Sequence, residues 1–224
     1  MGGFSIMVNL PTNVYVDGFN LYYGAVRNTP YKWLDIKALS LKLLPTLQIN
    51  RIRYFTARVK ALPHDPQKPS RQDIYLRALR TIPNLSIHEG HFVGWPVLMP
   101  QYPFAYPNQW SKQPQKVQVH RTDEKGSDVN LATYLLDDCF ANDFDQAVVI
   151  SNDADLATPI SLVTGKYGKN VCVINPHSYH KVSRDLLKVA TTSVWTINRS
   201  VLAACQFPLV LTDGTGAFSK PSTW

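Results

Sequence analysis

The sequence lacks any run of about 18 apolar residues, the length that a membrane-spanning helix needs. Its first residues, MGGFSIMVNLPTN, contain no basic segment followed by a long apolar one, so no secretory signal is predicted. Cysteine is scarce as well: Cys139, Cys172 and Cys205 lie far apart and form no CxxC pair, which is typical of a reducing compartment. These absences predict a soluble, cytoplasmic protein whose cysteines serve packing.

Three common signatures are also missing. The chain has no GxxxxGK[ST] loop, no GxGxxG after a strand and no GxSxG elbow, which argues against P-loop, dinucleotide-binding and α/β-hydrolase sites. Zinc is disfavoured too, because the pairs His88–His91 and His177–His180 lack a Cys cluster or an obvious third ligand.

The composition is typical of one globular domain. With 224 residues, 45% of them hydrophobic and 17% charged, the chain is long enough for a substantial core and unlike a disordered protein. Lysine and arginine outnumber aspartate and glutamate by 23 to 16. This surplus favours contact with a polyanion, nucleic acid first, although a basic surface also serves solubility alone. We expect a single domain over residues 1–200 and a C-terminal tail over residues 206–224.

Two aspartates follow the most apolar strand that the sequence predicts. Ala147–Ile150 is wholly apolar, and the polar turn after it carries Asp153 and Asp155 before a helix opens at Leu156. In open α/β sheets ligands bind at the carboxyl ends of strands, where strand tips and helix starts diverge. Paired acids in such a crevice repel each other unless a cation binds them, and Mg²⁺ prefers oxygen ligands. The turn therefore predicts a cation site.

Two more acids are expected at the same rim. Asn13–Asp17 has the pattern of a buried parallel strand, so Asp17 lies at its carboxyl end, with the amide of Asn20 nearby. A helical apolar period that begins near Ser127 places Asp128 in a first helical turn. Each acid alone has an ordinary explanation, an Asp-Gly turn for the first and the helix dipole for the second. Their convergence from separate segments predicts a shared site.

The rest of the chain alternates strands with helices, which predicts an α/β fold. Further strands are expected at Ile52–Ala57, Leu85–Glu89, Val117–His120, Val171–Ile174 and Val194–Ile197, and helices at Trp33–Leu44, Arg71–Arg80, Leu156–Thr164 and Ser183–Ala190.

An insertion near residues 92–116 interrupts this pattern. It is rich in proline and interleaves aromatic side chains with few charges. Long proline-rich excursions inside a domain are usually functional or mobile. Its aromatic residues would cover the core, a protein partner or a second copy of the chain, or, as the less favoured alternative, stack on unpaired bases. The tail over residues 206–224 has no periodicity and is expected to be extended or poorly ordered.

The predicted acid cluster has a defined chemistry. It would bind one or two divalent ions, lower the pKa of an ion-bound water and polarise a phosphoryl oxygen for in-line attack. Lys125 would hold the polyanion close to the acids. Arg71 is a further candidate for contact with a phosphate backbone, although solvated arginines are commoner.

Four motifs carry a family resemblance. In order, VDGFN, EKGSDVNLATYLL, SNDADLATPI and VSRDLLKVATTSVWTI resemble NYN domains, a branch of the PIN-like nucleases, from about Asn13 to Ile197. The resemblance implies a PIN-like three-layer sandwich with a central, mainly parallel sheet, and a ribonuclease that depends on Mg²⁺ or Mn²⁺. Asn20 matches the amide after the first acid, and Ser151 and Asn152 stand where the family often has Ser-Gly. The acids that the resemblance implies as metal ligands are Asp17, Asp128, Asp153 and Asp155.

The sequence thus predicts a divalent-metal-dependent endoribonuclease that hydrolyses single-stranded or loop RNA, with those four acids as the catalytic and metal-binding residues. The expected substrate contacts are Asn20, Lys125, Ser151, Asn152 and Arg71. DNA stays open as a substrate, because no feature identifies a reader of the 2′-hydroxyl. The alternatives are a nucleic-acid-binding or scaffolding module with little or no catalysis and, less favoured by the basic surface, a nucleotide phosphatase.

Overall fold

The structure, a computed structural model, describes residues 11–177 and 182–224, and of residues 193–196 only the backbone. Its centre is a sheet of order β4-β3-β2-β1-β5-β6-β7. Neighbouring strands pair in parallel except β3 and β4, which are antiparallel. The expected α/β fold with a mainly parallel sheet is confirmed. The strands are β1 (Pro11–Asp17), β2 (Gln48–Ala57), β3 (Leu85–Pro100), β4 (Lys116–Lys125), β5 (Gln146–Ile150), β6 (Asn170–Asn175) and β7 (Thr192–Thr196).

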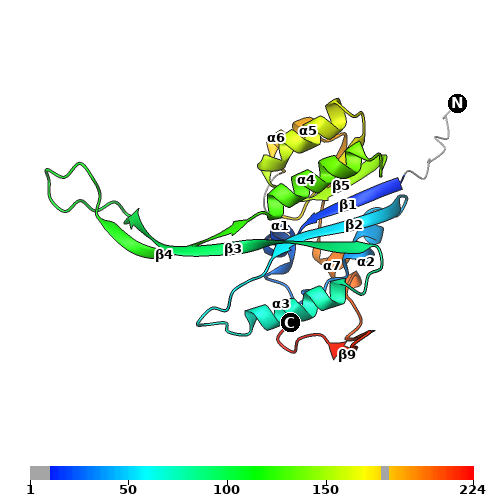
Figure 1. Cartoon of the computed structure of the whole chain (residues 1–224), viewed down its shortest axis with the longest axis horizontal. Helices are drawn as coiled ribbons and strands as arrows, with labels where there is room; N and C mark the ends of the chain where they lie inside the picture. Colours follow the sequence, from blue (N-terminus) through cyan, green and yellow to red (C-terminus); the bar gives the residue numbers. More distant parts are fainter. Residues whose placement is uncertain (1–10, 178–181) are drawn as a thin grey trace.

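Helices cover both faces of this sheet (Figure 1). Because successive residues of a strand point to opposite faces, Val14 and Val16 join one core and Tyr15 joins the other. The first core contains residues of α2 (Ile36–Leu43), α3 (Lys68–Leu79) and α7 (Arg199–Ala204), and the second contains residues of α4 (Ser127–Phe140), α5 (Ala157–Gly165) and α6 (Arg184–Val189). The three cysteines are buried in these cores, as expected. None of the helices in the described ranges has the length and hydrophobicity of a membrane span.

The strand order reverses between β1 and β5. From β1 the chain builds β2, β3 and β4 toward one edge, then returns to the other side of β1 with β5, β6 and β7. Ligands of doubly wound sheets bind at such a switch point, because the loops after the two strands diverge there. Val16 lies beside Ile150 in the sheet, so the chain leaves both strands at the same level. A short helix α1 (Gly18–Leu21), a π-helical turn η1 (Tyr22–Val26) and a 3₁₀ turn η2 (Ala154–Leu156) begin at this edge.

Several helix starts are where the sequence places them. The carboxylate of Asp35 accepts hydrogen bonds from the backbone N–H groups of Lys37 and Ala38, and so caps α2. Helix α4 begins at Ser127, after Gly126 in a left-handed conformation. Helix α7 has no counterpart among the expected elements.

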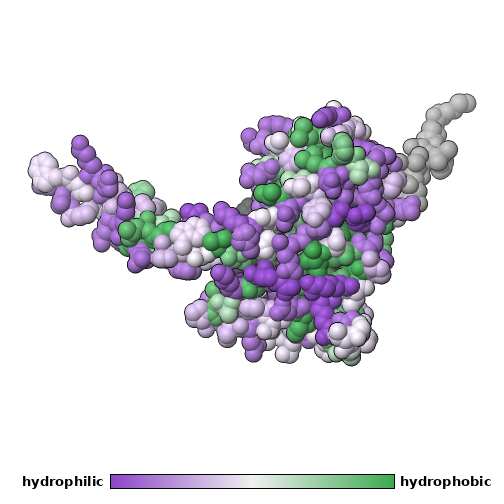
Figure 2. Space-filling view, viewed as in Figure 1, coloured by the Kyte–Doolittle hydropathy of each residue, from purple (hydrophilic) through white to green (hydrophobic). Residues whose placement is uncertain are grey.

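The insertion is regular rather than irregular. β3 continues to Pro100 and pairs with β4 from His91↔Lys125 to Pro100↔Lys116, leaving only residues 101–115 as a loop. Figures 1 and 2 show the resulting hairpin as an arm that stands clear of the body. The prolines are tolerated because each strand of a two-stranded ribbon has an open edge, where an N–H is not needed for pairing.

Of the two expectations for the tail, poor order is wrong, and extended backbone is found in a regular form. Residues 210–219 form a hairpin of β8 (Val210–Asp213) and β9 (Gly216–Ser219). The indole N–H of Trp33 donates to the carbonyl of Pro208 at 2.8 Å, and Trp33 also packs edge-on against Phe218 and Trp224. Contacts with a partner 175 residues earlier order the tail, and local periodicity cannot reveal them.

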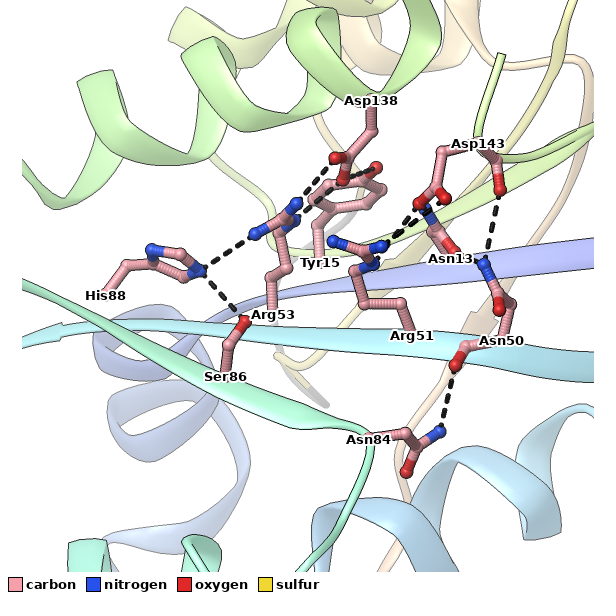
Figure 3. Close-up of polar contacts among 10 residues, drawn as sticks. All are labelled: Asn13, Tyr15, Asn50, Arg51, Arg53, Asn84, Ser86, His88, Asp138 and Asp143. Atoms are coloured by element: carbon pink, nitrogen blue, oxygen red, sulfur yellow. Dashed lines mark hydrogen bonds and ion pairs between the residues drawn. The ribbon is translucent and has the colours of Figure 1, made fainter. Parts of the chain in front are cut away.

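A buried ion pair ties the sheet to α4 (Figure 3). The guanidinium of Arg53 on β2 donates to both carboxylate oxygens of Asp138, at 2.5 and 2.7 Å, and the hydroxyl of Tyr15 donates to the same carboxylate at 2.8 Å. Another guanidinium N–H of Arg53 lies 3.2 Å from Nε2 of His88. Because a guanidinium can only donate, Nε2 is the unprotonated nitrogen, and burial beside this cation lowers the pKa of His88 to about 4.

Candidate functional site

The acidic motifs at the switch point are joined by one hydroxyl. Ser151, fully buried after β5, donates its hydroxyl to Oδ2 of Asp17 at 2.9 Å. The same hydroxyl accepts the backbone N–H of Asp153 at 3.1 Å. A hydroxyl can donate once and accept as well, so Ser151 holds the ends of β1 and β5 in one arrangement. The structure thus brings Asp17 and Asp153 together, as the strand ends predict.

The amide of Asn20 crosslinks the same loops. Its Oδ1 accepts the backbone N–H of Asn152 at 3.0 Å and lies 3.0 Å from Nε2 of His177. A backbone N–H can only donate, so this amide atom is the oxygen, and Nε2 of His177 carries a proton. The carbonyl of the Asn152 side chain accepts the N–H of Ser183 ahead of α6. Both asparagines therefore shape the site, and the amide nitrogen of Asn20 donates to none of the described residues.

Asp128 approaches the site from α4. It is half-buried in the first turn of that helix, and burial raises its pKa, with further contributions from Asp153, Glu124 and Asp155. Glu124 meanwhile accepts the N–H of Ser127 at 3.1 Å. Asp155 is exposed, and its N–H donates to the carboxylate of Asp153 at 3.0 Å. The four predicted acids thus act on one another electrostatically.

Asp17 is the most buried of these carboxylates. Its side chain also accepts the N–H of Asn20 at 2.9 Å, yet burial raises its pKa to about 6, and the charges of Asp128 and Asp153 add to the rise. Within residues 11–177 and 182–224 none of the four acids forms an ion pair with lysine, arginine or histidine. The site therefore holds acidic groups whose charge no described lysine, arginine or histidine balances through an ion pair.

The donor set suits a hard divalent cation, with one restriction. All of the candidate groups are carboxylate or amide oxygens, the ligands that Mg²⁺ and Mn²⁺ take in proteins. No three histidine, cysteine or acidic side chains in the described ranges are close enough to hold one ion between them. Mg²⁺ usually retains several waters and binds one or two protein carboxylates. The acids therefore fit a hydrated ion and not a closed protein cage.

The two predicted basic contacts lie apart from each other. Lys125 is exposed at the base of the arm, three residues before Asp128. Arg71 lies on α3 and pairs with Asp65 at 2.5 Å, so its charge is already compensated. Contact with substrate stays a prediction for both. The arm also meets the site, since Phe92 packs edge-on against Phe19 with ring centroids 5.7 Å apart.

Two residues of the site are absent from the predicted set. Glu124 acts on Asp128, and the sequence offers His177 only as half of a disfavoured zinc pair whose other member, His180, lies outside the described residues. The signal for His177 is its position just after β6, at the carboxyl end of a parallel strand. This is the same signal that identifies Asp17.

A comparison with protein families decides the relationship. The model of the NYN domain matches residues 11–197. The chain belongs to the NYN domain family. The match spans the whole central sheet and all four acids, and it places this NYN domain on a PIN-like nuclease fold. It ends before α7 and the C-terminal hairpin.

Two relatives give this NYN domain context. It is 30% identical over 236 aligned positions to a protein of Pseudomonas putida (strain S16) named 6-hydroxy-3-succinoylpyridine 3-monooxygenase HspA, covering 96% of this chain and 75% of that protein. Its fold is similar to the crystal structure of a protein of unknown function from Vibrio parahaemolyticus, with a TM-score of 0.53 and 15% identity, over 89% of this chain and 98% of that one. At that identity the second likeness concerns the fold alone.

Proposed function

We propose that this NYN domain is a divalent-metal-dependent endoribonuclease that cuts single-stranded or loop RNA. The observation that carries the proposal is the hydroxyl of Ser151, which binds Asp17 and Asp153 at once at the switch point of the sheet. Unbalanced carboxylates held in a fixed arrangement are the groups that a phosphoryl-transfer site needs. The net charge of +7 suits a polyanionic substrate.

Each residue of the site would have a separate role in this reaction. Asp17 and Asp153 would hold the ion, and Asp128 and Asp155 would orient its waters. Bound there, Mg²⁺ or Mn²⁺ would supply a water of lowered pKa and charge stabilisation at the phosphate. The amide nitrogen of Asn20, which neither of the two contacts of its amide oxygen uses, would donate to a phosphate oxygen. Lys125 would attract the backbone of the RNA at the base of the arm.

A cleavage assay tests this proposal. Labelled RNA with a single-stranded loop is incubated with the purified chain and Mg²⁺ or Mn²⁺, beside DNA of the same sequence. We expect cleavage that stops in EDTA and slows on the order of 100-fold in Asp153→Asn, as when one electrostatic stabiliser is removed from a site. Asp137→Asn, an exposed change on α4, is the matched control and should cut normally. RNA that binds but is never cut would favour a binding module, and cleavage in both EDTA and Asp153→Asn would sink the proposal.

A second candidate function comes from the relative named a monooxygenase. The two chains are 30% identical over nearly the whole of this chain. The second candidate is therefore the insertion of oxygen into a pyridine ring. In dinucleotide-binding sheets the turn after the first strand is glycine-rich and receives a pyrophosphate. Here that turn begins with the buried carboxylate of Asp17, which repels phosphate and attracts a cation. Oxygen uptake with 6-hydroxy-3-succinoylpyridine and a reduced nicotinamide, measured beside the RNA assay, separates the two functions.

A further inference from the structure

A pocket opens next to the acids, on the other side of Gly18. It encloses about 120 Å³, many times the space that a single water needs. Gly18 and Phe19, which directly follow Asp17, form part of its wall. A side chain at Gly18 would lie 2.7 Å from both the carbonyl of Phe55 and the ring of Tyr54, so glycine lets the pocket wall approach β2. The aromatic residues around the pocket are Phe19, Tyr22, Tyr23, Tyr54, Tyr75 and Trp224.

Two buried hydroxyls of β2 line this pocket. Tyr54 is 6% exposed and Thr56 is 3% exposed, and they lie on the same face of the strand. Neither hydroxyl forms a hydrogen bond with another described residue. Neither oxygen is sealed away from solvent either, unlike the side-chain oxygens of Asn84 and Gln206. Each hydroxyl can therefore form a hydrogen bond to a polar atom of a ligand that displaces water from the pocket.

The charged side chains around the pocket indicate the charge of a ligand that it can bind. Lys32, Lys68 and Arg71 line the pocket, and Asp65 is the one acidic side chain among the described residues of the lining. That carboxylate pairs with Arg71 at 2.5 Å, while neither lysine forms an ion pair with another described residue. Two positive charges are thus left for a ligand. Aromatic walls favour a planar ring, which tyrosine and tryptophan contact over large areas.

We propose that this pocket binds a planar aromatic ring that carries an anionic group. The ring packs among the aromatic side chains, Lys32 and Lys68 contact the anion, and the hydroxyls of Tyr54 and Thr56 bind polar ring atoms. A nucleotide and a free aromatic carboxylate share this chemistry. The proposal does not depend on RNA cleavage, but if the chain is a nuclease, a nucleotide bound here lies against Gly18 and Phe19, which directly follow Asp17.

Calorimetric titration of the full chain in EDTA tests the pocket, because chelation removes metal-dependent binding at the acids. The anionic probes are adenosine 5′-monophosphate and pyridine-3-carboxylate, and the neutral probes are adenosine and pyridine-3-carboxamide. We expect at least one anionic probe to bind at least about 10-fold more tightly than its neutral counterpart. Binding of only the nucleotide identifies a nucleotide site, and binding of only the carboxylate identifies a site for free aromatic acids.

Variants assign that binding to the pocket. Lys32→Met and Lys68→Met should each weaken the anionic probe about 5-fold or more, and Tyr54→Phe and Thr56→Val, which remove only a hydroxyl, about 3-fold or more. Lys37→Met, at an exposed position of α2, is the matched control and should bind as the unaltered chain does. Absence of binding by both anionic probes, or binding that none of the four variants weakens, overturns the proposal. Asp153→Asn should keep this binding, so the pocket and the nuclease can fail separately.

Discussion

Asp17 and Ser151 lie 134 residues apart in the sequence and are joined by a hydrogen bond of 2.9 Å. The bond spans the point where the strand order reverses, so it fixes the two loops from which the acids emerge. Its geometry depends on a serine hydroxyl that is fully buried and also accepts the N–H of Asp153. Two acidic motifs that look independent in the sequence therefore form one structural unit.

Ser151→Ala should damage this unit at both ends. Oδ2 of Asp17 loses its donor, the N–H of Asp153 loses its acceptor, and the pKa of Asp17 rises further because the lost hydrogen bond had lowered it. We expect a loss of about 1 to 3 kcal/mol in the free energy of unfolding, measured in urea, because buried polar groups are left unsatisfied. Ser161→Ala, at an exposed position of α5, should change that free energy by less than about 0.5 kcal/mol. Equal effects of the two variants would contradict the bridging role.

Asp17→Asn should stabilise the chain above pH 6 while it removes the proposed nuclease activity. The pKa of Asp17 in the folded chain, about 6, lies above its ordinary 3.8, so the folded state binds more protons between these pH values. Ionisation of Asp17 therefore lowers stability as the pH rises through this window, and asparagine does not ionise. In EDTA at pH 7.5 we expect a gain of roughly 1 to 3 kcal/mol, which disappears toward pH 4. A variant that is less stable than the original chain at pH 7.5 would show that the buried charge is compensated.

The buried ion pair between Arg53 and Asp138 should be costly to break. Asp138→Ala leaves a buried guanidinium without its carboxylate and the hydroxyl of Tyr15 without its acceptor. Removal of one partner of such a pair typically costs about 3 to 5 kcal/mol, measurable in urea. Asp137→Ala, the exposed neighbour on the same helix, is the control. A loss below about 1 kcal/mol for Asp138→Ala would mean that water reaches the pair.

His88 should make the fold sensitive to mild acid. Its folded pKa of about 4 lies below the ordinary 6.5, so between these values the unfolded chain binds more protons. The contribution of His88 is thus fully present above pH 6.5 and is lost as the pH falls toward 4. His88→Gln cannot take up this proton, and its melting temperature should fall less than that of the original chain from pH 7 to pH 4.5. Parallel curves for the two proteins would contradict the neutral assignment of the imidazole.

The sequence could predict the rim of acids because strand ends are local features. Asp17 and Asp153 each follow a short apolar run, and parallel strands bring such ends to one edge without any knowledge of distant contacts. The position of Asp128 could be predicted for a similar reason, because a helical period locates the first turn of α4. Local sequence patterns and the direction of the strands were therefore enough to predict where the four acids lie.

The features that the sequence missed depend on contacts between distant segments. The hairpin in the tail is ordered by Trp33 and by Arg77, whose guanidinium pairs with Asp213 at 2.6 Å. The arm is regular because each strand of an isolated ribbon has a free edge that accepts proline, whereas proline normally argues against a strand. The aromatic pocket is lined by residues of α1, β2 and α3 and by Trp224, the last residue of the chain. Local periodicity in the sequence cannot predict that these segments lie together.

The measurement that tests the central claim most directly is anomalous diffraction from a crystal soaked in Mn²⁺. We predict a peak between the carboxylates of Asp17 and Asp153, with at least one direct oxygen contact at about 2.2 Å, and its loss in a soaked crystal of Asp17→Asn. A well-ordered crystal with no manganese peak within about 5 Å of either carboxylate would contradict a cation site at the switch point, and with it the proposed nuclease.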